Sequence, residues 1–195
     1  MRKTILYLAA SLLAFSCKKG DNNDPTITDR VVNKTITPIP VGPNFMISDY
    51  LDVDNDGKID INFFGQITDS TKTLTLKTDN DSTLILSGYT PYASYPGGIV
   101  PTTKDMAPNT FVDVSSSYWI AVSYTALVST KKTKEINTGF HGAGDKYVAL
   151  KLLKPSGQDF YAWMLINVSE DFKTILVKEV AANTTPNEGI KIGEK

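Results

Sequence analysis

Apolar and polar side chains alternate in short runs along most of the chain beyond residue 60. A two-residue period places successive side chains on opposite faces and is typical of a half-buried β-strand. No segment in this region sustains the 3.6-residue period of an amphipathic helix. The pattern predicts strands at residues 60–67, 72–77, 82–87, 117–124, 146–153, 160–168 and 174–180.

Polar turn signals separate these predicted strands. Asp-Asn-Asp at 79–81, Pro-Ser-Gly at 155–157 and Ser-Glu-Asp at 169–171 are residues that favour tight turns. Short strands with polar turns indicate an all-β fold, either a sandwich or a barrel. We predict a single antiparallel β-sandwich, jelly-roll-like, over residues 44–195, with a three-stranded meander from Lys146 to Val180.

The N-terminus follows a different pattern. Arg2 and Lys3 precede an apolar run at 5–15, which is too short for a spanning helix of about 20 residues but suits the core of a signal peptide. Ala14–Cys17 resembles a bacterial lipobox, and Cys17 is the only cysteine. We therefore interpret residues 1–16 as a lipoprotein signal peptide and Cys17 as the acylated N-terminus that anchors the protein to a membrane. The alternative is an ordinary secretory signal that ends near a chance cysteine.

A polar, turn-rich segment, residues 17–43, joins the signal to the predicted sandwich. Its end, Pro-Ile-Pro-Val-Gly-Pro at 38–43, predicts an extended and semi-rigid arm. The tract at 18–24 resembles the Lys-then-acid tether of surface-exposed lipoproteins in Bacteroidota, although a solvated spacer would have the same composition. We expect an outer-membrane lipoprotein displayed on the cell surface. A lipoprotein that faces the periplasm is the alternative.

The charge of the chain limits the kinds of partner that we expect. Loss of residues 1–16 would remove two basic residues and no acidic one, and would leave a net charge of −3. Arg30 would then be the only arginine, and the chain has no basic stripe. Proteins that bind phosphate groups normally use several arginines and a stripe of basic residues, so nucleic acid is not an expected partner. The expected partners are therefore the membrane, which the protein would contact through its lipid, and a glycan or an envelope protein.

The strongest chemical signal is the segment Asp-Val-Asp-Asn-Asp-Gly-Lys-Ile-Asp at 52–60. Carboxylates at its positions 1, 3, 5 and 9, with a glycine at 6, suit a tight loop around a hard cation such as calcium. The expected ligands are the side chains of Asp52, Asp54, Asp56 and Asp60 and the backbone carbonyl of Lys58. Phe63 stands where an EF-hand needs a bidentate glutamate, so the segment resembles the nine-residue calcium loops set between β-strands in secreted proteins. The alternative is an Asp/Asn/Gly turn without an ion.

Other candidate sites are weaker. Tyr89, Tyr92 and Tyr95 lie in a Pro/Gly-rich segment and suit stacking on sugar rings, although we interpret this segment as a structural cap on the core. His141 is the only histidine, and we interpret it as a loop residue. No nucleophile, base and orienting group can be assembled from the sequence, so we expect no enzyme. A hydrolase with paired carboxylates is the least favoured alternative.

The C-terminal third carries a family resemblance. Tyr-Ala-Trp at 161–163, Ala-Ala-Asn at 181–183 and Ile190 to Gly193 resemble a family of exported β-rich lipoproteins of Bacteroidota and other bacteria. In that family an Asp-rich calcium-type loop precedes a Tyr-Gly-Trp strand, an Ala-Tyr-Asn segment and a final Ile-x-x-Gly. Ala162 and Ala182 replace the family's glycine and tyrosine. The resemblance implies an exported, calcium-stabilised β domain without a settled activity.

The function expected from the sequence is therefore a non-enzymatic surface module. It would be a lipid-anchored β-sandwich with a structural calcium loop, and it would bind a glycan or a protein or contribute to the cell envelope. A dedicated carbohydrate-binding component is the main alternative, with the segment that holds Tyr89, Tyr92 and Tyr95 as its aromatic platform.

Overall fold

The computed structural model describes residues 27–78, 83–88, 94–95, 98–99, 102–116, 119–120, 125–131, 134–136 and 140–195. These residues form strands and turns, and none of them belongs to a helix long and apolar enough to cross a membrane. The predicted all-β class is confirmed. Cys17, Tyr89 and Tyr92 lie outside the described residues.

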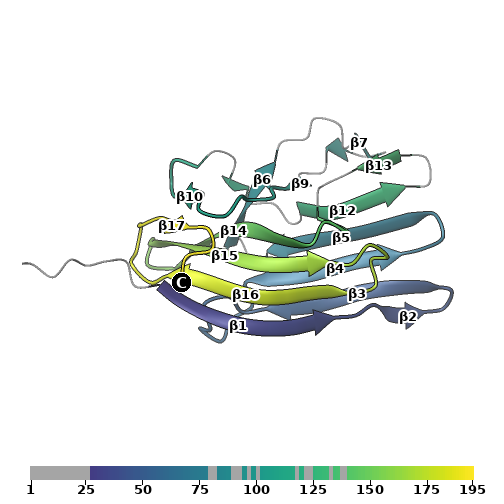
Figure 1. The fold of residues 1–195 in the computed structure, drawn as a ribbon, viewed down its shortest axis with the longest axis horizontal. Helices are drawn as coiled ribbons and strands as arrows, with labels where there is room; N and C mark the ends of the chain where they lie inside the picture. Colours follow the sequence, from purple (N-terminus) through teal and green to yellow (C-terminus); the bar gives the residue numbers. More distant parts are fainter. Residues whose placement is uncertain are drawn as a thin grey trace, which may run out of the picture.

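The strands follow one another along the whole described chain (Figure 1). They are β1 (Ile27–Ile36), β2 (Ile39–Val41), β3 (Asn44–Leu51), β4 (Ile61–Ile67), β5 (Thr71–Thr78), β6 (Thr83–Gly88), β7 (Ser94–Tyr95), β8 (Gly98–Ile99), β9 (Thr102–Thr103), β10 (Phe111–Val112), β11 (Trp119–Ile120), β12 (Thr125–Lys131), β13 (Lys134–Ile136), β14 (Asp145–Leu153), β15 (Asp159–Val168), β16 (Ile175–Asn183) and β17 (Ile190–Lys191).

One continuous 13-stranded sheet folds into two halves, here called sheet A and sheet B, that face each other (Figure 1). Sheet A has the strand order β1-β16-β15-β14-β6, and sheet B has the order β2-β3-β4-β5-β12-β9. β6 belongs to both, because residues 83–85 pair with β14 and residues 87–88 pair with β9. All the long strand pairs are antiparallel, as the predicted sandwich requires.

The main core lies between the two sheets. In β4 the side chains of Ile61 and Phe63 are buried while Phe64 points outward, which is the two-residue alternation expected of a strand with one solvated face. Facing them in sheet A are residues such as Met164 and Ile166, both fully buried. Each side chain of this size stabilises the fold by about 1.5–3 kcal/mol when it is fully buried.

A second core covers the other face of sheet A. Tyr161 and Trp163 of β15 pack there with Val112 and with the C-terminal residues Ile190 and Ile192. The indole Nε1 of Trp163 donates a hydrogen bond to the backbone oxygen of Glu194 at 3.2 Å. β15 is therefore buried on both faces, which explains why its sequence is an almost continuous apolar run.

The predicted meander from Lys146 to Val180 is confirmed as β14, β15 and β16. The predicted strand at 117–124 contains β11, of which two residues are described. β12, which follows at Thr125–Lys131, was not predicted.

The N-terminal boundary of the domain has to be corrected. Residues 27–43, assigned to a tether from their polar composition, form β1 and β2. β1 pairs with β16 from Ile27↔Asn183 to Ile36↔Ile175, and Ile36 is buried in the main core. β1 is an edge strand with a partly exposed pattern, so its sequence lacks the apolar run that marks the inner strands. The sandwich therefore includes β1, from Ile27 onward, and does not begin at residue 44.

Candidate metal site

The Asp-rich segment forms the connection between β3 and β4. The backbone amide of Asp60 donates to the carbonyl of Leu51 at 3.0 Å, which closes the loop at its base. Within the loop the chain turns at Asn55 and Gly57, whose φ angles are +63° and +85°. Asparagine and glycine tolerate this left-handed conformation better than other residues, so the local sequence itself specifies the loop.

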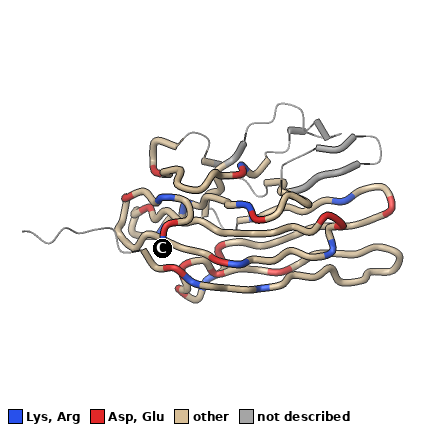
Figure 2. Tube along the Cα trace, viewed as in Figure 1, with Lys and Arg blue, Asp and Glu red and all other residues tan. Residues whose placement is uncertain are grey.

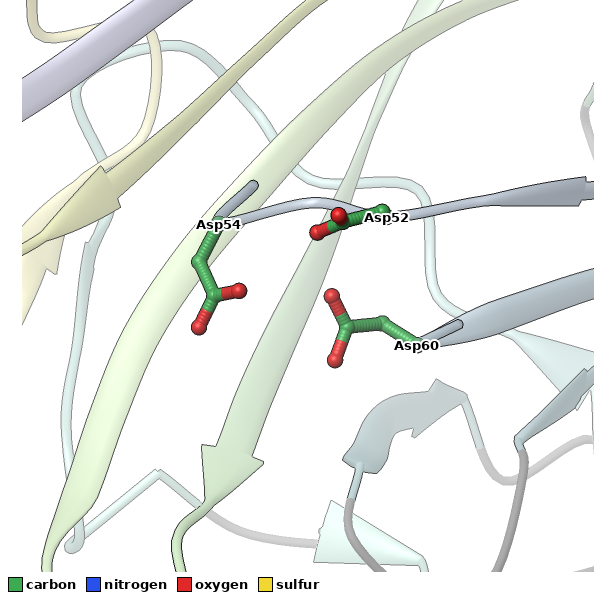
Figure 3. Close-up of side chains that lie close together, drawn as sticks. All are labelled: Asp52, Asp54 and Asp60. Atoms are coloured by element: carbon green, nitrogen blue, oxygen red, sulfur yellow. The ribbon is translucent and has the colours of Figure 1, made fainter. Parts of the chain in front are cut away.

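Three of the aspartates converge. One carboxylate oxygen each from Asp52, Asp54 and Asp60 lies within 4.8 Å of the others. Figure 3 shows the three side chains directed into a common space, two from the loop just after β3 and one from the residue just before β4. This set of oxygens could hold a metal ion.

Asp60 is the most constrained of the three. Its side chain is buried, and its Oδ2 accepts a hydrogen bond from the amide of Val53 at 2.7 Å. Burial is the largest influence on the pKa of Asp60 and raises it, the Val53 amide lowers it, and the carboxylates of Asp54 and Asp52 raise it; the resulting pKa is about 6. A buried carboxylate beside two others is unfavourable when it is ionised, and a bound cation would remove that cost.

The other two carboxylates organise the backbone of the loop. Asp52 accepts hydrogen bonds from the amide of Asn55 at 2.6 Å and from the amide of Gly57 at 2.9 Å. Asp54 accepts one from the amide of Asp56 at 3.2 Å. Such short-range bonds hold the carboxylates in place before any ion arrives, and they also occur in turns that bind no ion.

Asp56 does not belong to the convergent group. The carboxylate of Asp56 contacts the ammonium group of Lys154 at 2.9 Å and accepts a bond from the amide of Lys58 at 2.9 Å. The hydrogen bond from Lys154 lowers the pKa of Asp56. Of the four predicted carboxylate ligands, the structure therefore brings together Asp52, Asp54 and Asp60; the carbonyl of Lys58 stays a prediction.

Lys154 was missed by sequence analysis. It follows the end of β14, and its ammonium group forms salt bridges with both Asp54 and Asp56. Burial lowers the pKa of Lys154, but the hydrogen bonds to the two carboxylates outweigh that effect and the net shift is upward. Because Lys154 lies far from the loop in the sequence, no local pattern could reveal this contact.

Arg30 of β1 is a second unexpected neighbour. Its guanidinium donates to the side-chain oxygen of Asn55 at 3.0 Å and to the backbone oxygen of Asp52. Its Nε is buried and has no hydrogen-bond partner. Arg30 and Lys154 tie the loop, which belongs to sheet B, to strands of sheet A. Figure 2 shows acidic and basic positions close together at this end of the sandwich.

The remaining candidates are not part of this site. The backbone of Tyr95 lies in the short β7–β8 hairpin. The ring of His141 stacks on Phe172 at a centroid distance of 4.8 Å, and its backbone forms an isolated bridge with Val168. These contacts give His141 a packing role.

Fold and site together define an all-β sandwich with an aspartate-rich loop that could hold a metal ion. No protein-family model, curated protein or solved structure matches the chain.

Proposed function

We propose that this protein is a lipid-anchored, non-enzymatic module of the bacterial cell envelope with a binding or structural role. One calcium ion in the loop at 52–60 would stabilise its β-sandwich. The observation that carries the proposal is the convergence of Asp52, Asp54 and Asp60, with Asp60 buried at the junction of two core strands. A cation at this point would neutralise repelling carboxylates and fix the start of β4.

Calcium is the metal that suits these ligands best. The loop offers carboxylate and carbonyl oxygens and contains no histidine or cysteine, the ligands that zinc and copper prefer. Calcium accepts six to eight oxygens in a flexible geometry, whereas magnesium needs a near-ideal octahedron. The side chain of Asp56 and the carbonyl of Lys58 could complete the shell if Asp56 leaves Lys154.

The surroundings favour a structural role over a catalytic one. A carboxylate-based hydrolase needs two carboxyl groups on opposite sides of the substrate. Here the three carboxylates lie in one loop within 4.8 Å of one another, and Asp60 is buried. Asp60 is therefore placed to hold an ion beneath the loop and not to contact a substrate.

The anchor is supported by the ordered signal at residues 1–17 and by the position of the first strand. β1 begins at Ile27, so residues 18–26 would separate the lipidated Cys17 from the sandwich. Nine residues span at most about 30 Å when fully extended. The domain would then lie close to the membrane, on the outer surface in the favoured orientation and in the periplasm in the alternative one.

Thermal unfolding tests the calcium site. The mature chain with Cys17→Ser, to keep it free of lipid, would be melted in calcium, in magnesium and in chelator. Extracellular calcium modules have dissociation constants of about 10⁻⁴–10⁻³ M. At ten times that concentration, binding adds about 1.4 kcal/mol, or roughly 3–6 °C in melting temperature. Asp52→Asn should abolish the rise, and Asp171→Asn, in a turn outside the loop, should keep it. Equal melting temperatures in calcium and in chelator would contradict the proposal.

A further inference from the structure

A cavity of about 340 Å³ opens beside the metal loop. Its walls come from β1, from residues 53–56 of the loop, from the turn between β14 and β15, and from the end of β16. Small-molecule sites in proteins typically measure about 300–1,000 Å³, so this cavity has room for a small ligand. It lies at the end of the sandwich where the loop of sheet B meets the strands of sheet A.

The charges in the wall balance. Arg30 and Lys154 contribute two positive groups, and Asp54 and Asp56 contribute two negative groups. Lys154 already forms salt bridges with both carboxylates. No excess charge of either sign therefore remains to select an anion or a cation.

Neutral polar groups supply most of the remaining chemistry. The amide of Gln158 and the hydroxyls of Thr28 and Ser156 line the cavity together with the half-buried ring of Phe160. The amide of Asn183 also lies in the wall, but it is buried and already bonded to the backbone. Amides and hydroxyls both donate and accept hydrogen bonds. Sugar hydroxyl groups also do both, and the C–H face of a sugar ring packs well against an aromatic side chain.

Arg30 lines the cavity, but its guanidinium is directed to the metal loop. Two of its nitrogens are engaged by the metal loop, but its Nε is buried without a hydrogen-bond partner. A buried donor without a partner costs about 1–3 kcal/mol, so native structures rarely leave one unsatisfied. Protein atoms shield this Nε, so the cost remains with the folded chain, and a ligand in the cavity would be held by the exposed amide and hydroxyls of the wall.

We propose that this cavity binds a neutral saccharide of one or two sugar rings. The inference deepens the binding role proposed above and rests on it, but it requires neither the calcium ion nor the lipid anchor. It places the sugar beside Thr28, Gln158 and Phe160, apart from the tyrosine segment singled out in the sequence.

Two strand positions provide a matched pair of variants. Thr28 is exposed on β1 and lines the cavity, so Thr28→Trp should fill the space without disturbing the core. Ser48 is exposed on β3 and does not line the cavity, so Ser48→Trp adds the same side chain elsewhere. Tryptophan is well tolerated in strands, so both variants should fold. Gln158→Ala, in the turn before β15, removes one polar group and keeps the backbone.

The test is calorimetric titration of the mature chain, with Cys17→Ser, against neutral mono- and disaccharides of glucose, mannose, galactose and xylose. Glucuronic acid and N-acetylneuraminic acid serve as charged probes. We expect at least one neutral sugar to bind, with Thr28→Trp weakening it at least tenfold, Gln158→Ala by roughly twofold to tenfold, and Ser48→Trp leaving it unchanged.

Binding should persist in chelator, which separates this inference from the calcium site. A chain that shows the calcium-dependent rise in melting temperature but binds none of these sugars would overturn the saccharide inference and leave the metal proposal standing. Binding that survives Thr28→Trp, or that is confined to the acidic sugars, would also overturn it.

Discussion

At the scale of single residues, the metal loop holds a buried carboxylate whose negative charge is only partly offset by nearby positive charge. Asp60 is buried among other carboxylates, which raises its pKa to about 6. Lys154 supplies a positive charge to Asp54 and Asp56 but forms no salt bridge with Asp60. The metal-free loop therefore keeps an electrostatic strain at Asp60 that a divalent ion would relieve.

This strain predicts an unusual pH dependence for the metal-free protein. The pKa of Asp60 is about 6 in the folded state and 3.8 in a model peptide, so the folded state binds the proton more tightly. The associated stability is fully present below the unfolded pKa and is lost as pH rises through 6. Between pH 5 and pH 7 the loss from this group is about 1 kcal/mol.

The measurement is the free energy of unfolding in chelator, compared between wild type and Asp60→Asn at both pH values. The variant cannot titrate at this position, so the difference between the two proteins should shift by about 1 kcal/mol from pH 5 to pH 7, in favour of the variant. A difference that does not change with pH would show that Asp60 titrates normally.

Lys154 should compete with the metal ion. Its ammonium group occupies Asp54 and Asp56, two of the expected ligands, and repels any cation in the loop. Lys154→Met should therefore tighten calcium binding several-fold and lower the stability in chelator by up to about 1 kcal/mol, since the salt bridges are partly exposed. Lys178→Met, which breaks a salt bridge with Asp145 away from the loop, is the control. Calorimetric titration with calcium measures the affinity of each protein. An unchanged or weaker calcium affinity in Lys154→Met would refute the competition.

At the scale of strands and loops, an element could be predicted where burial leaves an apolar pattern in its own sequence. β14, β15 and β16 could be predicted because burial dictates their apolar side chains. β1 could not, because an edge strand buries few side chains and its composition resembles that of a linker. The aspartates of the loop are adjacent in sequence and were found, whereas Arg30 and Lys154 reach them only through the pairing of distant strands.

The revised boundary of the domain can be tested within β1 itself. Ile36 is 2% exposed and belongs to the main core, whereas Val31 in the same strand is 61% exposed. Ile36→Ala should destabilise the protein by about 2–4 kcal/mol, and Val31→Ala by less than about 0.5 kcal/mol. Denaturant unfolding measures both. Equal and small effects would mean that β1 contributes little to the sandwich.

At the scale of the whole molecule, the cavity lies between the metal loop and β1, the first described strand. β1 leads from the N-terminal segment past the cavity, and its Arg30 holds the metal loop. In sheet A the same strand pairs with β16, whose end forms another wall of the cavity. A sugar or a metal bound here would thus be held by the part of the domain nearest to the proposed anchor.

The anchor itself gives the last prediction. If Cys17 carries the lipid, Cys17→Ala should move the protein from the membrane fraction to a soluble one, because acyl chains contribute about 0.8 kcal/mol for each buried methylene. Fractionation of the cells that produce the full chain measures the shift. Asp52→Asn is the control, since it disturbs the metal loop and should leave the protein in the membrane fraction. A protease added outside intact cells distinguishes the two orientations, because only a surface-displayed domain is cut. If the Cys17→Ala variant stays in the membrane fraction, Cys17 does not carry the anchor, and the lipoprotein proposal is wrong.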